Sequence, residues 1–493
     1  MTKAATRPEL RAPAEWLAGW PPAIAVVAIL TAFRLLWLAG GPIDLYGDEA
    51  QYWIWAKEPA FGYYSKPPLV AWLIAASTAI LGDGAVAIKL PSALVHAATA
   101  LVLFAIGRDL GGRAVAFWSA VVWATLPAVT LSALIISTDP PLLLCWALAL
   151  HAFQRARRAP GFGWWLACGL WVGLGLLAKY AMGYFLLSAA LYLLATPSDR
   201  PLLWRRLPAT LAVAAALLAP NIAWNVANGF ATIRHTGDNA NLGGTLFNPG
   251  ALAEFLASQF LVFGPIPFLA LLAALATGGD ADGRRLGFFV WPTLVVACVI
   301  ALLSRAHANW AAPAYVAATP LAVAWLVGRG RGRLVEVAVA LHVALAVVVM
   351  LGPAAVRAAG WELPARYDPW RRVSGWAALG EEVGALRRRH RDAGLLVDSR
   401  LLLCSLVYYV RPHPFDVVKW NPDGVANDHF ELTTHLEQAP HARFLLVTAR
   451  PDPSEILARF ASAERLAEIV VPLGPDRDRR HYVFLVAGFR GYH

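Results

Sequence analysis

The segment between residues 41 and 72 carries the residues of this chain that are best suited to chemistry. Asp48 and Glu49 stand side by side, and adjacent carboxylates repel one another unless a cation or hydrogen bonds compensate. A carboxylate placed in this way could accept a proton from an acceptor hydroxyl, an effect worth about 100-fold to 10,000-fold in rate. The alternative is an acidic first turn of a helix, where the helix dipole stabilises Asp and Glu.

Aromatic residues surround the acidic pair. Such residues commonly lie at a membrane interface, where their amphipathic rings are stable. The same rings can line a site for a sugar or a lipid headgroup, so Tyr63 and Tyr64 are candidate substrate-binding residues. The aromatic residues that we consider here are Tyr46, Tyr52, Trp53, Trp55, Tyr63 and Tyr64.

Two lysines and one aspartate in this and other loops are further candidate site residues, and Lys66 is suited to binding a phosphate. Lys66 precedes Pro67 and Pro68, a fixed extended turn that presents its ammonium group; the alternative is an ordinary lysine that reaches water from the interface. Lys179 separates two apolar runs and has no acidic neighbour in sequence, so it is a functional candidate. Asp139 lies before two prolines and is either a helix cap or a site residue.

Two further loops contain polar residues that could contact a substrate. Residues 225–244 form a long connection rich in Asn and Gly, which is typical of a lid or binding loop, and it contains His235. The segment SRAHANW contains Arg305, His307 and Asn309. We include His235, Arg305 and Asn309 among the candidate substrate-binding residues.

The high hydrophobic content and low charge of the chain indicate that these loops connect membrane helices. The chain has 493 residues, of which 58% are hydrophobic and 15% charged, against about 25% charged in soluble proteins. These values exclude an ordinary soluble enzyme and a disordered chain. Apolar runs long enough to be candidate spans occur near 21–40, 85–107, 113–132, 140–154, 163–178, 180–196, 207–226, 251–277, 286–304, 310–328 and 334–354.

Basic residues indicate how these eleven runs are oriented. A shorter run, 67–82, begins with two prolines, and if it does not cross the membrane, nearly every arginine cluster lies on one side. Because basic loops favour the cytosol, we expect 67–82 to be interfacial or re-entrant, the N-terminus to be cytosolic and the tail to be external. The basic residues lie between apolar runs rather than on one soluble face, which argues against a nucleic-acid partner. All candidate site residues then share the external face.

Residues 355–493 differ in character from residues 1–354. They carry 19 of the 42 basic and 17 of the 32 acidic residues. Short apolar runs typical of strands alternate with helical segments at 374–390, 400–410 and 453–465, which predicts a small α/β domain with a partly parallel sheet. We therefore expect an all-α membrane domain over 1–354 and an external α/β domain over 355–493. Acceptor recognition is the role we expect of this domain.

Several motifs in their order resemble one family. Residues 1–330 resemble the GT-C superfamily of membrane glycosyltransferases, in particular the bacterial branch related to protein O-mannosyltransferases and the lipid A aminoarabinose transferase. The motifs that carry the resemblance are GDEAQYW, YYSKPPLVAW, GDGAVAIKLPSAL, STDPPLLL, LLAKYAMGYF and PNIAWNVANGF.

The resemblance implies a role for each matching residue. It implies that Asp48 is the catalytic base and that Glu49 supports the site. It implies that Lys66 and Lys179 bind the donor's phosphate, and that Asp139 is a second acidic site residue. The segment around Arg305 departs from the lysine-rich form of some relatives.

The resemblance also implies a reaction, namely inverting transfer of a sugar from a polyprenyl phosphate to a hydroxyl of an envelope glycolipid such as lipid A, a polysaccharide or a protein. It places the chain in a bacterial inner membrane with the tail in the periplasm. No cofactor is required, since lysines can neutralise the leaving phosphate, although some relatives use a divalent metal. The alternative function is a transporter or flippase of a lipid-linked sugar, but that would place ionisable residues near mid-membrane.

Overall fold

The chain folds into two compact units. The computed structural model describes residues 19–238, 246–278 and 281–492. The helical unit contains the first helix up to Leu36, residues 66–70 and residues 89–347, and the sheet unit contains residues 37–65, 71–88 and 348 onward. The predicted cytosolic N-terminus and residues 239–244 of the predicted long loop lie outside the described residues. The first loop and residues 355–493 thus belong to the same unit.

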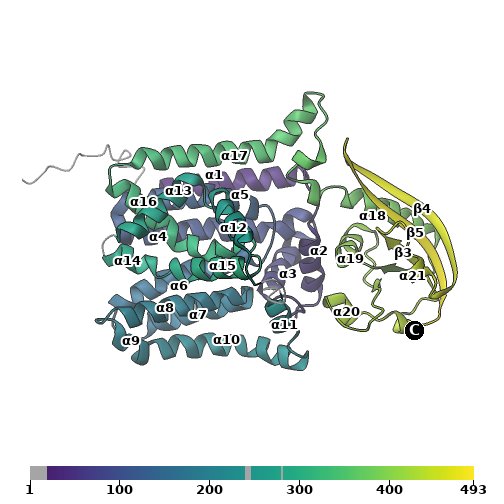
Figure 1. Cartoon of the computed structure of the whole chain (residues 1–493), viewed down its shortest axis with the longest axis horizontal. Coiled ribbons are helices and arrows are strands. Elements are labelled where there is room, and N and C mark those ends of the chain that lie inside the picture. Colours follow the sequence, from purple (N-terminus) through teal and green to yellow (C-terminus); the bar gives the residue numbers. More distant parts are fainter. Residues whose placement is uncertain (1–18, 239–245, 279–280, 493) are drawn as a thin grey trace, which may run out of the picture. The chain divides into compact units, whose positions relative to one another are not determined.

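The helical unit is built from helices (Figure 1), and its long helices are apolar. Three of its helices extend into segments of the sheet unit: α1 (Trp20–Ala39), α4 (Ala85–Thr125) and α17 (Gly332–Ala358). The others are α5 (Pro127–Ser132), α6 (Asp139–Arg158), α7 (Gly163–Ala178), α8 (Gly183–Ala195), α9 (Arg200–Arg205), α10 (Leu207–Ala227), α11 (Ala231–Asp238), α12 (Pro249–Val262), α13 (Pro265–Thr277), α14 (Ala281–Gly287), α15 (Trp291–Leu303) and α16 (Ala312–Gly328).

The number of membrane crossings differs from the sequence expectation. Within the described ranges, six helical segments are long and apolar enough to cross a membrane, or seven if a bent pair counts as one. That pair is α12 and α13, which meet at 112°, so the predicted run 251–277 is not one straight span. Helices α7 and α8 cover their predicted runs but are shorter than the roughly 20 residues that a straight crossing needs. The expectation of eleven spans is therefore not confirmed.

Close packing of α7 against α10 fixes one side of the helical unit. A Cβ at Gly169 would lie 2.6 Å from the backbone oxygen of Thr210, and one at Gly173 would lie 2.7 Å from a methyl carbon of Leu217. Small residues four positions apart allow two helix backbones to approach closely. Any larger residue at these positions would separate the two helices.

The sheet unit contains a five-stranded mixed sheet. Its order is β2-β1-β3-β5-β4, in which β1 pairs in parallel with β2 and β3, and β5 pairs antiparallel with β3 and β4. The central strands consist of near-continuous apolar runs, as expected for strands buried on both faces. The strands are β1 (Ala393–Val397), β2 (Val418–Lys419), β3 (Arg443–Thr448), β4 (Phe460–Gly474) and β5 (Arg477–Phe489).

Helices complete the sheet unit. The predicted partly parallel sheet and the predicted helices at 374–390 and 400–410 are confirmed, whereas the predicted helix at 453–465 is wrong, since only Ser454–Leu457 is helical and β4 starts at Phe460. These helices are α2 (Gly47–Lys57), most of α3 (Leu69–Leu81), α18 (Trp376–Arg389), α19 (Arg400–Tyr409), α20 (His429–Thr433) and α21 (Ser454–Leu457). At a rise of 1.5 Å per residue, the 13 residues of α3 extend about 20 Å, less than the roughly 30 Å of a hydrocarbon core.

Candidate active site

The two adjacent carboxylates of the first loop have different environments. Both lie in the first turn of α2, but Glu49 is fully buried and its Oε2 accepts a hydrogen bond of 2.8 Å from the backbone N–H of Tyr46. This contact caps the start of α2. The side chain of Asp48 is 38% exposed. Of the two acids, Asp48 is therefore the one that a substrate can reach, and Glu49 holds the helix start on which Asp48 stands.

An arginine of the tail pairs with Asp48. Nη1 of Arg400 donates to Oδ1 of Asp48 at 2.7 Å and also donates to the side-chain oxygen of Gln51. Burial by itself would lower the pKa of Arg400, but the neighbouring acidic groups, Asp48 first among them, together raise that pKa. The pair thus keeps a cation beside the candidate base.

Close packing at the start of α2 fixes this pair. Helix α2 packs on α19, and a Cβ at Gly47 would lie 2.5 Å from Cδ2 of Leu401, so any side chain at this position would have to displace that methyl group. Asp44 adds a second connection, because its Oδ2 accepts hydrogen bonds from the backbone N–H groups of Trp376 and Ala377 at the start of α18. The loop and the tail domain therefore hold each other in place around Asp48.

The aromatic residues of the loop are used mainly for packing. Trp55 and Tyr63 stack with ring centroids 4.4 Å apart, and His429 lies edge-on to both. Tyr63 is only 2% exposed, and its hydroxyl donates to the backbone oxygen of Trp55. Burial raises the pKa of Tyr63 to about 12 and lowers that of His429 to about 4. This burial does not support the predicted direct contact between Tyr63 and a substrate.

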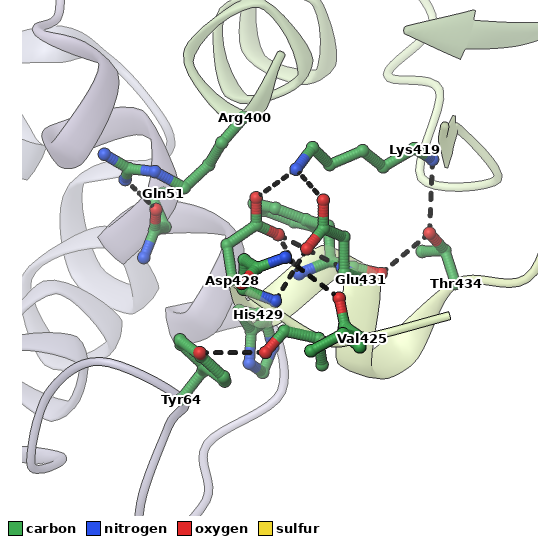
Figure 2. Close-up of polar contacts among 12 residues, drawn as sticks. Gln51, Tyr64, Arg400, Lys419, Val425, Asp428, His429, Glu431 and Thr434 are labelled. Atoms are coloured by element: carbon green, nitrogen blue, oxygen red, sulfur yellow. Dashed lines mark hydrogen bonds and ion pairs between the residues drawn. The ribbon is translucent and has the colours of Figure 1, made fainter. Parts of the chain in front are cut away.

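Tyr64 connects the first loop to a segment of the tail. Its hydroxyl donates to the backbone oxygen of Ala426 at 2.9 Å (Figure 2). That segment is fixed by a buried ionic group in which the ammonium of Lys419 binds the carboxylates of Asp428 and Glu431. Asp428 also accepts from the N–H groups at the start of α20. The predicted substrate role of Tyr64 stays a prediction, since its hydroxyl already has a partner within the protein.

Replacing Lys419 with Met is expected to destabilise this segment strongly. The change leaves two carboxylates without their buried cation, and breaking a buried ion pair from one side costs about 3–5 kcal/mol. Thermal unfolding of the purified protein measures the loss. The matched control is Arg443→Met, whose ion pair with Asp392 is largely exposed and should contribute at most about 1 kcal/mol. Equal losses in the two variants would contradict a structural role for Lys419.

The helical unit brings four predicted site residues together. Nζ of Lys179 lies 2.7 Å from Oδ1 of Asp139, and Nδ2 of Asn309 donates to Oδ2 of Asp139 at 2.6 Å. Lys66 also attracts this carboxylate. The side chains of Lys179 and Asp139 are only 25% and 15% exposed. The predicted convergence of loop residues is confirmed for Asp139, Lys179 and Asn309. Asp139 uses its carboxylate for these two partners rather than as a cap of α6.

A break between two helices presents Lys179 to Asp139. Helix α7 ends at Ala178, Lys179 is extended, and a short 3-10 turn leads into α8. Asn221 and Asn225, one turn apart on α10, hydrogen-bond the hydroxyl of Tyr180 at 2.7 and 3.2 Å. Both asparagines are fully buried. The motifs around Lys179 and Asn221 therefore serve together to fix the position of the lysine.

The two remaining predicted residues lie elsewhere in the helical unit. Arg305 lines a cavity of about 250 Å³ together with Glu254, Ser258 and His307. His235 is half-buried on α11. Their substrate roles stay predictions, although the cavity borders the segment that provides Asn309.

Sequence reasoning missed two residues of the first-loop cluster. From the sequence, Arg400 is placed only within a predicted helix. The feature that could have identified it is a cation at the first residue of that helix, where the helix dipole disfavours positive charge. Asp83 accepts from Nε1 of Trp53 at 2.8 Å and pairs with Lys57. Burial would raise the pKa of Asp83, but these two partners outweigh it and lower that pKa. Asp83 therefore braces the C-terminal half of α2.

Several known proteins resemble this chain in sequence or in fold. Residues 65–224 match the dolichyl-phosphate-mannose-protein mannosyltransferase family. The chain is 34% identical over 415 residues to the lipid A galacturonosyltransferase RgtD of Rhizobium johnstonii, covering 83% of this chain and 86% of that protein. It is 27% identical over 244 residues to the lipopolysaccharide core galacturonosyltransferase RgtA of the same organism, covering 47% of this chain and 48% of that protein.

The fold is that of a solved membrane enzyme. The crystal structure of ArnT from Cupriavidus metallidurans bound to undecaprenyl phosphate superposes with a TM-score of 0.64 and 17% identity, covering 96% of this chain and 98% of that one. The likeness to RgtD extends over most of both chains and makes this protein a glycosyltransferase, so the alternative of a transporter is not supported. The chain belongs to the GT-C superfamily of membrane glycosyltransferases.

Proposed function

We propose that the protein transfers galacturonic acid from a polyprenyl-phosphate donor to a hydroxyl of lipid A, with inversion at the anomeric carbon. The observation that carries this proposal is the group formed by Lys179, Asn309 and Asp139, with Lys66 acting on the same carboxylate. Two lysines around one acid in a poorly exposed position are suited to a phosphate that gains negative charge as it leaves.

The lysines act on the leaving group. In this half-buried position the attraction between ammonium and phosphate is stronger than in bulk water. Asp139 orients Lys179 before the donor binds, since their ion pair of 2.7 Å fixes the flexible lysine side chain. Lys66 and Lys179 then stabilise the charge on the polyprenyl phosphate after its bond to the sugar breaks. Such preorganised charge is the main source of catalysis in this mechanism.

Asp48 acts on the acceptor. Its carboxylate takes the proton of the acceptor hydroxyl while the hydroxyl oxygen forms a bond to C1 of the sugar. The bond between C1 and the phosphate oxygen breaks on the opposite side of the ring, so the configuration at C1 inverts. Arg400 and the capped start of α2 hold Asp48 in one orientation during this step.

The sugar and the acceptor are proposed from the relatives. RgtD is named a lipid A galacturonosyltransferase, RgtA a lipopolysaccharide core galacturonosyltransferase, and ArnT was crystallised with undecaprenyl phosphate. We commit to lipid A because the likeness to RgtD extends over 83% of this chain at 34% identity. We expect the protein not to transfer the sugar to other envelope glycolipids, polysaccharides or proteins.

The proposed location is the periplasmic face of a bacterial inner membrane. The distribution of arginine clusters supports this orientation. Single cysteines introduced at Ser65 and at the exposed Ser462, in a background without the four native cysteines, should both react with an impermeant maleimide in intact spheroplasts. A cysteine at the exposed Arg331 should react only after the membrane is permeabilised. Labelling of Ser65→Cys and Arg331→Cys from the same side would contradict the orientation.

The experiment that tests the proposed function compares donors. Purified protein in proteoliposomes is given lipid A and either polyprenyl-phosphate galacturonic acid or the corresponding nucleotide sugar. We expect transfer from the lipid-linked donor alone, because the proposed phosphate site lies on membrane helices and the sequence has no glycine-rich phosphate loop. Transfer from the nucleotide sugar alone would refute the donor assignment.

A further inference from the structure

Arg400 occupies a position that helix stability does not explain. It is the first residue of α19, where the helix dipole disfavours a cation, and Ser399 before it provides no side-chain cap. Its guanidinium instead points to the first loop, where Nη1 binds Asp48 and Gln51; Figure 2 shows the contact with Gln51. The position of this cation is therefore explained by its contacts with the first loop, beside the candidate base Asp48.

Among the described residues, three of the five N–H donors of this guanidinium group have no acceptor. A guanidinium has five N–H donors, and Nη1 provides the two that Asp48 and Gln51 accept. Across the described part of the chain, no acceptor is found for Nε and Nη2, and the side chain is 32% exposed. This edge has the parallel N–H geometry that binds a carboxylate side-on with two hydrogen bonds. Arg400 can thus hold Asp48 at one end and a second carboxylate along its edge.

The position of that edge fits a uronic acid sugar. In such a sugar the carboxylate carbon C6 is attached to C5, and only the ring oxygen lies between C5 and the reacting carbon C1. A group that binds the carboxylate must therefore lie next to the group that acts at C1. The hydrogen bond of 2.7 Å between Arg400 and Asp48, beside the close packing of Gly47 on Leu401, holds these two groups next to each other, as the carboxylate and C1 of the sugar require.

We infer that Arg400 is a specificity-determining residue whose Nε and Nη2 edge binds the carboxylate of the transferred uronic acid. This inference rests on the proposed function, because it requires a donor sugar that carries a carboxylate. It assigns the tail domain a part in selecting the donor sugar, beyond the acceptor recognition expected from the sequence. A neutral hexose, with a hydroxymethyl group at C6, would leave this edge without its ionic partner.

The test compares two donors that differ only at C6. Reconstituted Arg400→Met and wild-type proteins are assayed with polyprenyl-phosphate galacturonic acid and polyprenyl-phosphate galactose, and the ratio of kcat/KM values is measured. We expect this ratio, acid over neutral, to fall about 10-fold to 100-fold in R400M, as expected for the loss of hydrogen bonds to a charged group. The lost contact with Asp48 lowers both rates by a common factor and cancels in the ratio.

Two further variants make the result specific. Arg400→Lys keeps the charge but not the two-pronged edge, so its ratio should lie between those of the wild type and R400M. Arg387→Met removes an equal charge from α18, where Arg387 binds the backbone oxygen of Pro412 and pairs with Asp416, and should leave the ratio unchanged. If R400M does not fold, R400K decides the matter by the same ratio.

The outcomes separate this inference from the proposed function. An unchanged ratio in R400M or, failing that, in R400K would overturn the inference, since Arg400 would then only position Asp48. If the wild-type protein does not use the galacturonic acid donor at all, the proposed function fails first. A lowered ratio in both Arg400 variants, with R387M like the wild type, supports the inference.

Discussion

Replacing Asp48 with Asn is expected to lower the rate of sugar transfer by about 100-fold to 10,000-fold, which is the usual contribution of a general base. The amide retains an oxygen that can accept from Nη1 of Arg400, so the position of the side chain is preserved while its ability to take a proton is lost. Because the ion pair between Arg400 and Asp48 is about one-third exposed, its loss should change stability by less than about 1 kcal/mol. Single-turnover transfer to lipid A and thermal unfolding measure the two quantities.

The matched control is Asp44→Asn, which makes the same chemical change four residues earlier in the same loop. Asn caps a helix as well as Asp does, so the cap of α18 should persist and transfer should stay close to that of the wild type. If D48N retains transfer, Asp48 is not the base. If D44N loses as much activity as D48N, the effect is one of loop structure rather than of proton transfer.

Replacing Lys179 with Met is expected to lower kcat by about 100-fold to 1,000-fold, the usual effect of removing one group that stabilises charge in a transition state. The change also removes the ion pair that orients Asp139, which then retains Asn309 and the attraction of Lys66. Lys179→Arg should recover part of the activity, since it keeps the positive charge. The measurement is single-turnover transfer at saturating donor.

A second lysine gives the control for Lys179. Lys57→Met removes a cation that pairs with Asp83 and should leave kcat within about threefold of the wild type, as expected for a partly exposed ion pair. An unchanged kcat in K179M would contradict a role in stabilising the leaving phosphate. The double variant K179M with Asp139→Asn should lose less than the product of the single effects, because the two residues act as one unit.

The convergence of loop residues could be predicted from the sequence. Each of Asp139, Lys179 and Asn309 stands at the end of an apolar run, and helices of similar length bring such ends to one face. The helix break at Lys179 could also be predicted, because a charged lysine between two apolar runs is unfavourable inside lipid and indicates that the first membrane segment ends there.

The sequence could not distinguish the two acids of the first loop. Asp48 and Glu49 have the same charge and the same neighbours, and only the burial of Glu49 and its contact with the backbone of Tyr46 separate a cap from a base. The pairing of Arg400 with Asp48 joins residues 352 positions apart, which no local pattern reports.

Local propensity failed where long-range pairing decided the structure. The residues around 460–470 include Ala, Glu, Arg and Leu, which favour a helix. They form strand β4 because β5 pairs with it along almost its whole length. The bend between α12 and α13 was missed because hydropathy alone does not report the direction of a helix.

The central claim is that the protein moves a uronic acid from a lipid phosphate to lipid A with Asp48 as base, and mass spectrometry of lipid A after incubation with reconstituted protein tests it most directly. With polyprenyl-phosphate galacturonic acid, we expect the wild-type protein to yield lipid A that is heavier by one galacturonic acid residue, and D48N to leave nearly all lipid A unmodified after the same incubation time. Unmodified lipid A with the wild-type protein, or equal modification by both proteins, would contradict the claim.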